Sequence, residues 1–137
     1  MGRDHRKGHG GMNTEGFIWH ELMSRDPGAS EGFYETVTGV AIQRVADAPG
    51  DYRLLLVDGR PIAGMTGPRA GSTTWPSGGP EGHWVPYFGT DDVEAAVGRA
   101  KSGGGTVLVE PVDIPGWGRA AVLRDPDGAT FGVYRPA

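Results

Sequence analysis

The chain contains no cysteine, which excludes a disulfide framework and thiol-based catalysis. It also lacks a long hydrophobic run, because no apolar stretch approaches the roughly 20 residues that a membrane-spanning helix needs. No apolar segment follows the basic N-terminus, so we expect no secretory signal and a cytoplasmic protein. Histidine is scarce, with four in the chain and two of them at positions 5 and 9, which argues against a Ser-His-Asp arrangement.

The chain has little excess charge of either sign. Its formal net charge of −4 over 137 residues argues against a nucleic-acid partner and fits a neutral or cationic ligand better than a polyanion. The length suits one compact domain with enough apolar residues for a core. Glycine (25) and proline (11) are abundant, but they lie between periodic apolar segments, which indicates tight turns rather than disorder.

Two segments of the chain are similar to each other. Residues 17–34 read FIWHELMSRDPGASEGFY, and residues 82–99 read GHWVPYFGTDDVEAAVGR. An aspartate lies seven residues after the tryptophan in each segment, as Asp26 after Trp19 and Asp91 after Trp84. A strand–helix–strands unit repeated at about 65 residues predicts two pseudo-symmetric modules around one cleft, which suits a small ligand.

Periodicity and turn residues predict the elements of each module. We expect a disordered tail over residues 1–15, a first module over 16–66, a linker loop over 67–82 and a second module over 83–137. The predicted strands are 17–23, 40–46, 52–57, 61–66, 84–89, 106–112, 119–124 and 130–134, and the predicted helices are 29–37 and 92–100. Thr90 is a candidate N-cap of the second helix. The predicted fold class is α+β, with two βαβββ modules whose curled mixed sheets enclose a cleft.

Several motifs resemble the vicinal oxygen chelate superfamily, which includes glyoxalase I, bleomycin-resistance proteins and extradiol dioxygenases. The D-P-D-G sequence at 125–128, followed by a strand, is similar to its closing hairpin. Its D…S..FY pattern is matched by Asp26, Ser30, Phe33 and Tyr34. The segment GRPIAG at 59–64 resembles an actinobacterial branch usually labelled glyoxalase-like or hydroxylase. The resemblance covers roughly residues 16–136 and implies the fold, while the superfamily hosts many chemistries and also non-enzymes.

Metal-dependent members of this superfamily place a His, Gln or Glu ligand in the first and fourth strands of each module. The resemblance maps these positions onto Trp19, Gly64 (or Ala63), Trp84 and Gly132. None of these side chains can bind a metal, so the resemblance implies no metal site, and we expect no cofactor. His20 is one residue away from a ligand position. Strand alternation sends it to the opposite face of the sheet, unless the register slips by one residue.

The face expected to line the cleft carries aromatic rings and one carboxylate. The candidate ligand-binding residues are Trp19, Glu21, Gly64, Trp84, Pro86, Phe88, Trp117, Gly132 and Tyr134. Aromatic walls bind flat or cationic molecules by stacking and cation–π contacts, although the tryptophan rings would equally fill the barrel. An apolar wall would raise the pKa of Glu21 and make it a candidate general base; the alternatives are an anchor for a ligand ammonium and an exposed strand end. Trp75 and Trp117 are each either a lid over the cleft or a surface residue.

Three functions stay open at this point. The first is metal-independent binding of a small aromatic or cationic organic molecule, including antibiotic sequestration in the manner of bleomycin-resistance proteins. The second is a lyase, isomerase or hydroxylase-like enzyme of secondary metabolism that uses Glu21 as a base, or a metal through His20. The third is a structural homodimer without a ligand. The resemblance and the sheet edges lead us to expect a homodimer that binds a small molecule and neither nucleic acid nor membrane.

Overall fold

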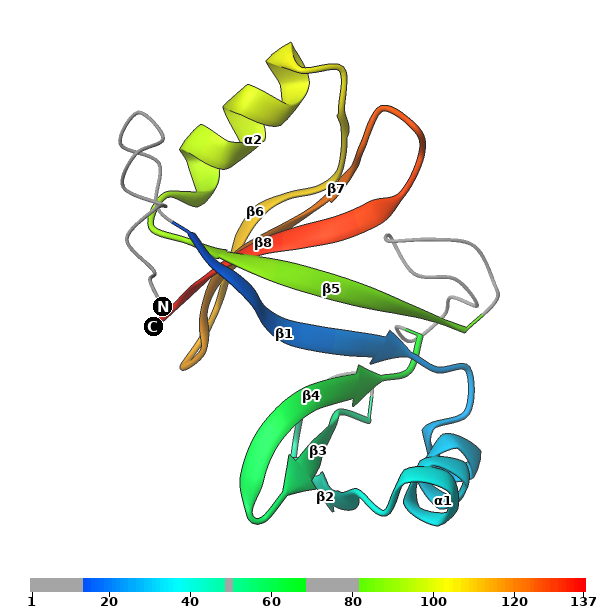
Figure 1. The fold of residues 1–137 in the computed structure, drawn as a ribbon. Coiled ribbons are helices and arrows are strands. Elements are labelled where there is room, and N and C mark those ends of the chain that lie inside the picture. The colour runs from blue at the N-terminus through cyan, green and yellow to red at the C-terminus, as the bar shows by residue number, and fades with distance from the viewer. Residues whose placement is uncertain (1–13, 49–50, 69–81) are drawn as a thin grey trace, which may run out of the picture. The chain divides into compact units, whose positions relative to one another are not determined.

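The computed structural model describes residues 14–48, 51–68 and 82–137 (Figure 1). The elements in these ranges are β1 (Thr14–Met23), α1 (Pro27–Thr38), β2 (Ala41–Arg44), β3 (Arg53–Val57), β4 (Arg60–Thr66), β5 (His83–Thr90), α2 (Val93–Ser102), β6 (Thr106–Ile114), β7 (Gly118–Arg124) and β8 (Thr130–Pro136). This order is βαβββ twice, so the predicted α+β class is confirmed. Neither of these helices is long and apolar enough to cross a membrane.

The two modules have the same strand order. In the first module the order is β2-β3-β4-β1, and in the second it is β6-β7-β8-β5. The first strand of each module pairs in parallel with the last, as β1 with β4 and β5 with β8, whereas the other pairs are antiparallel. Each sheet is therefore mixed, as predicted. β1 begins at Thr14, inside the segment expected to be a tail, and residues 1–13 and most of the expected linker lie outside the described residues.

Residues that can be recognised in the sequence mark the start and the end of helix α1. The side chain of Asp26 accepts a hydrogen bond from the backbone N–H of Ala29 at 3.2 Å, and Pro27 occupies the first turn. Gly39 ends the helix with a φ of 80°, in the left-handed region that glycine adopts without strain. The predicted stop at Gly39 is confirmed.

Helix α2 begins one residue later than expected. Its N-cap is Asp92, whose side chain accepts a hydrogen bond from the backbone N–H of Ala95 at 3.0 Å. The prediction of Thr90 as the N-cap was wrong, because its hydroxyl instead accepts a hydrogen bond from the Asp92 N–H at 3.2 Å. Asp26 and Asp92 are therefore the equivalent residues of the two modules.

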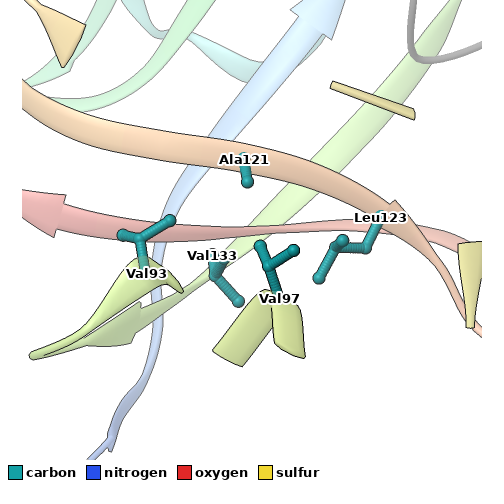
Figure 2. Close-up of a cluster of buried hydrophobic side chains, with 5 residues drawn as sticks. All are labelled: Val93, Val97, Ala121, Leu123 and Val133. Carbon is teal, nitrogen blue, oxygen red and sulfur yellow. The ribbon is translucent and has the colours of Figure 1, made fainter. Parts of the chain in front are cut away.

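Each helix packs on one face of its own sheet. In the second module the buried cluster consists of Val93, Val97, Ala121, Leu123 and Val133, contributed by α2, β7 and β8 (Figure 2). In the first module it consists of Leu22, Leu55, Ala63 and Met65, with Tyr34 of α1 packed against it. Because side chains alternate along a strand, these clusters also define which residues lie on the opposite face of each sheet.

A buried arginine ties the first helix to its sheet. Arg53, at the start of β3, is 3% exposed and forms ion pairs with Glu31 of α1 and with Asp51, the latter at 2.8 Å. Both carboxylates satisfy a guanidinium that would be costly to bury alone. By compactness, residues 19–85 form one unit, while residues 14–18 and 86–137 belong to the other.

Candidate functional site

Glu21 lies near the end of β1, on the sheet face opposite α1. Its Oε1 atom accepts two hydrogen bonds, from the indole Nε1 of Trp19 at 3.0 Å and from the hydroxyl of Tyr52 at 3.4 Å. Its Oε2 atom is buried and has no hydrogen-bond partner within the described residues. The two oxygens of this carboxyl group therefore differ, since Oε1 accepts from two donors and Oε2 from none in the part of the chain that the structure describes.

Burial raises the pKa of Glu21 from 4.5 to about 7. The hydrogen bonds from Tyr52 and Trp19 lower the pKa because they stabilise the carboxylate, but the loss of solvation outweighs them. The sequence left open whether Glu21 lies in an apolar environment or at an exposed strand end, and the structure places its Oε2 atom in a buried environment. A carboxyl group that titrates near neutrality exists in both protonation states at pH 7, which suits proton transfer.

Gly64 makes this arrangement sterically possible. It is the cross-strand partner of Glu21 in the parallel pair of β1 and β4. A Cβ atom at this position would lie 1.8 Å from the hydroxyl oxygen of Tyr52 and 2.5 Å from Oε2 of Glu21. The tyrosine hydroxyl and the carboxyl group therefore occupy the space of the missing side chain. The structure thus brings together three of the candidate residues or positions around one point: Trp19, Glu21 and Gly64.

Sequence reasoning missed Tyr52, which we had placed at the start of a strand without a role. One signal was available, because Tyr52 precedes Leu54 by two residues and Leu54 pairs with Gly64 in the antiparallel sheet. Alternation places Tyr52 on the same face as Leu54, which is the face of Glu21. Only the register of β3 against β4 reveals this, and a bulge between Leu55 and Leu56 interrupts that register.

The second module also places a tyrosine over a glycine. Tyr87 of β5 pairs with Gly132 of β8, and a Cβ atom on Gly132 would lie 2.2 Å from the Tyr87 ring. Tyr134, on the same face as Gly132, has its ring centre 6.4 Å from that of Tyr87. The hydroxyl of Tyr134 donates a hydrogen bond to the backbone carbonyl of Trp117 at 2.7 Å.

The prediction that Trp84, Pro86 and Phe88 share the face of Gly132 was wrong. Phe88 pairs with the core residue Val133, and its ring centre lies 6.0 Å from that of Phe131, which packs on the same cluster as α2. Trp84, Pro86 and Phe88 are two residues apart along β5, so they share one face of the strand. Phe88 places this face on the helix side of the sheet. Trp84 also contacts a helix residue, because its Nε1 donates to the hydroxyl of Tyr34 in α1 at 3.3 Å.

The prediction for β5 was wrong because it did not use the N-cap of α2 as the reference residue. The sequence repeat pairs Asp26 with Asp91, but the residue that caps α2 is Asp92. Shifting by one residue makes Val85, rather than Trp84, the equivalent of Trp19, and makes Tyr87 the equivalent of Glu21. A one-residue change of register moves every side chain to the other face of a strand.

The other candidate residues are less informative. His20 is exposed and shares the strand parity of Leu22, so it lies on the helix side as expected. Trp117 is 42% exposed in the turn between β6 and β7. Trp75 lies outside the described residues.

A separate open pocket of about 370 Å³ lies within residues 19–85, beside the N-terminal end of α1. Trp84 and Tyr34 line it, together with Ser24 and Ser30, whose hydroxyl oxygens are 2.6 Å apart. Glu21 does not line this pocket. Trp19 and Trp84, which we expected to line the same cleft, therefore belong to different surfaces of the unit formed by residues 19–85.

The chain belongs to the Glyoxalase/Bleomycin resistance protein/Dioxygenase superfamily, whose family model matches residues 16–133. Among curated proteins it is similar to the "Putative glyoxylase CFP32" of Mycobacterium tuberculosis, with 39% identity over 125 residues, which covers 90% of this chain and 45% of that protein. It is also similar to the "Anthracycline biosynthesis protein DnrV" of Streptomyces peucetius, with 35% identity, covering 85% of this chain and 46% of that protein. The chain thus spans a little less than half the length of these relatives.

Solved structures confirm the fold. A methylmalonyl-CoA epimerase from Streptomyces coelicolor, in complex with 2-nitronate-propionyl-CoA, superposes with a TM-score of 0.64 at 24% identity, covering 91% of this chain and 99% of that one. At this level of identity the similarity concerns the fold alone.

The metal that many members of the superfamily hold does not fit the residues of this chain. Trp19, Gly64 and Gly132 occupy three of the four ligand positions, and Val85 occupies the remaining one once the alignment of the modules is corrected. None of these four side chains carries a donor atom for a metal. No group of three or more His, Cys, Asp or Glu side chains that would hold a metal occurs in the described ranges.

Proposed function

We propose that this protein binds a small organic molecule over the sheet face that carries Trp19 and Glu21, that binding uncovers the buried Oε2 atom of Glu21, and that Glu21 then exchanges a proton with the molecule through this atom. The observation that carries the proposal is the buried Oε2 atom without a hydrogen-bond partner in the described residues, on a carboxyl group whose pKa is raised to about 7. A buried polar atom without a partner is costly and uncommon in a folded protein. A buried carboxyl group with a raised pKa and one oxygen left without a partner in the described residues is a candidate for proton transfer to a ligand.

The proposed step is balanced without a cofactor. In the carboxylate form, Oε2 accepts a proton from an acidic C–H or O–H group of the ligand, and the electron pair stays on the ligand. The neutral acid then returns the proton to another atom of the same molecule, or an elimination expels a leaving group that takes it up. The first outcome is an isomerisation and the second is a lyase reaction. Either one regenerates the carboxylate without a metal ion or an oxidant.

Two features support a planar, aromatic ligand. The indole ring of Trp19 lies next to the carboxyl group and supplies a flat apolar surface, and the Tyr52 hydroxyl donates to the same oxygen, Oε1. The relative from Streptomyces peucetius is named for anthracycline biosynthesis, which supports a role in the metabolism of antibiotics of that kind. We further propose that the protein is a homodimer in the cytoplasm, as expected from the sequence.

Sequestration of a ligand without chemistry is a second candidate, because the donor-free metal positions and the Trp19 ring suit binding alone. In that case Glu21 would serve as an acceptor for a donor group or a cation of the ligand. The two candidates differ in one measurable property: only the first transfers a proton.

The test uses an anthracycline dissolved in D₂O buffer with catalytic amounts of the protein. Binding is followed by quenching of tryptophan fluorescence, and proton exchange is followed by the loss of ¹H NMR signals and by mass spectrometry. We expect deuterium to enter the compound with wild-type protein and exchange to fall by roughly 10²-fold or more with Glu21→Gln, while binding persists. Binding without exchange in the wild type would favour sequestration, and the absence of any binding would contradict both candidates.

A further inference from the structure

The hydroxyl of Tyr52 lies in space that is available because residue 64 is a glycine and has no side chain. It lies within the volume of a side chain at Gly64, since a Cβ atom there would be 1.8 Å from the hydroxyl oxygen and 2.5 Å from the Cζ atom of the ring. Both contacts are far closer than real Cβ atoms show, so any other residue at position 64 would displace the tyrosine or the strand. The ring reaches this point from the segment before β3, 31 residues along the chain from Glu21.

We propose that Tyr52 is a positioning residue for Glu21: its hydroxyl, accommodated by the absent side chain of Gly64, holds Oε1 together with Trp19, so that Oε2 becomes the reacting oxygen. This inference rests on the proposed function, because it assigns a role to the same carboxyl group. It adds Tyr52, to which the sequence analysis assigned no role, as the residue that selects between the two oxygens.

The selection follows from simple hydrogen-bond accounting. A hydroxyl and an indole N–H that donate to Oε1 both stabilise negative charge there and both disfavour a proton on that atom. When the group is neutral, its proton is therefore on Oε2, which has no partner among the described residues. When the group is ionised, the free lone pairs are also on Oε2. Donation and acceptance of the proton thus occur at the same atom, and the carboxyl group need not rotate between the two steps.

The first experiment measures the titration of Glu21 directly, without any ligand. Protein labelled with ¹³C at the glutamate side-chain carboxyl is titrated by NMR, and the Glu21→Gln variant identifies the signal. In Tyr52→Phe, which keeps the ring over Gly64 and removes the hydroxyl, we expect the pKa of Glu21 to rise by roughly half a unit to one unit, the equivalent of one lost hydrogen bond. The matched control is Tyr134→Phe, whose hydroxyl donates to the Trp117 carbonyl rather than to a carboxylate, and which should leave the titration unchanged.

The outcomes separate this inference from the proposed function. If wild-type Glu21 titrates near 4.5, the proposed proton transfer loses its basis, whatever Tyr52 does. If wild-type Glu21 titrates near 7 but Tyr52→Phe titrates identically, the proposed function stands and the positioning role of Tyr52 is overturned. In the deuterium-exchange assay, a positioning role predicts a rate that falls by roughly three- to tenfold at unchanged affinity for the anthracycline.

A second experiment tests the steric half of the inference by thermal unfolding. Gly64→Ala should lower the melting temperature strongly in the wild type, because the new methyl group collides with Tyr52. In a Tyr52→Ala background the ring is gone, and the same substitution should cost much less, since only the flexible end of Glu21 remains within 2.5 Å. Additive effects of the two substitutions would show that Gly64 does not accommodate the tyrosine.

Discussion

Replacing Glu21 by glutamine removes a titrating group but keeps its shape. The amide oxygen can accept the hydrogen bonds of Trp19 and Tyr52, and the amide nitrogen takes the place of Oε2. The variant therefore imitates the neutral acid at every pH. Its stability relative to the wild type reports how much free energy the buried carboxyl group requires for ionisation.

The sign follows from the raised pKa. Glu21 has its usual pKa of 4.5 in the unfolded chain and a pKa of about 7 in the folded protein, so between these values the folded state binds a proton that the unfolded state has released. The free energy of unfolding of the wild type therefore falls as the pH rises through this window. A rise in pKa from 4.5 to about 7 corresponds to about 3 kcal/mol, most of which is lost by pH 8 and little of which is lost at pH 5.

We expect Glu21→Gln to gain about 2–3 kcal/mol on the wild type between pH 5 and pH 8, measured by urea unfolding at both pH values. Glu35→Gln, which removes an exposed carboxylate of α1, controls for the change in net charge and should show no comparable gain. A stability difference between wild type and Glu21→Gln that is the same at pH 5 and pH 8 would refute the reasoning. It would mean that Glu21 ionises in the folded protein as easily as in the unfolded chain.

Three further outcomes are expected. Elemental analysis of tag-free protein should find no stoichiometric Zn, Ni, Fe or Mn, because the positions of Trp19, Gly64, Val85 and Gly132 carry no donor atoms; about one metal per chain would contradict this. Trp19→Ala should weaken binding of an anthracycline by at least about 1 kcal/mol, whereas Trp84→Ala, on the helix side, should not; an equal loss in both variants would reject the assignment of faces. Light scattering at micromolar concentration should give a dimer, and a purely monomeric protein would overturn that expectation.

The fold was predictable because its signals are redundant. Asp26, Pro27 and Gly39 mark both ends of α1, and the same strand order recurs in the second module. A prediction of element type survives an error of one residue at a boundary, since the periodic apolar positions still fall on one face.

The candidate site was only partly predictable, because a site depends on register and a register error of one residue reverses a strand. In β1 a single aspartate precedes the helix, and the assignment of Trp19 and Glu21 to one face was correct. After β5 two aspartates are adjacent, and the predicted alignment used Asp91, whereas the side chain of Asp92 accepts the hydrogen bond from Ala95. Tyr52 was missed for a different reason, since its contact with Glu21 joins residues that are far apart in sequence.

The comparison of the two modules assigns the proposed proton transfer to one of them. Each module places a tyrosine in the volume left by a glycine of its last strand, Tyr52 over Gly64 and Tyr87 over Gly132. These glycines stand where metal-dependent members of the superfamily have a ligand, so in both modules a tyrosine fills the space that a ligand side chain would need. Only the first module adds a carboxyl group there, because the equivalent of Glu21 in the second module is Tyr87 itself. The pseudo-symmetry of the sequence therefore gives two similar aromatic surfaces, and the one residue that breaks it, Glu21, is the group on which a reaction would depend.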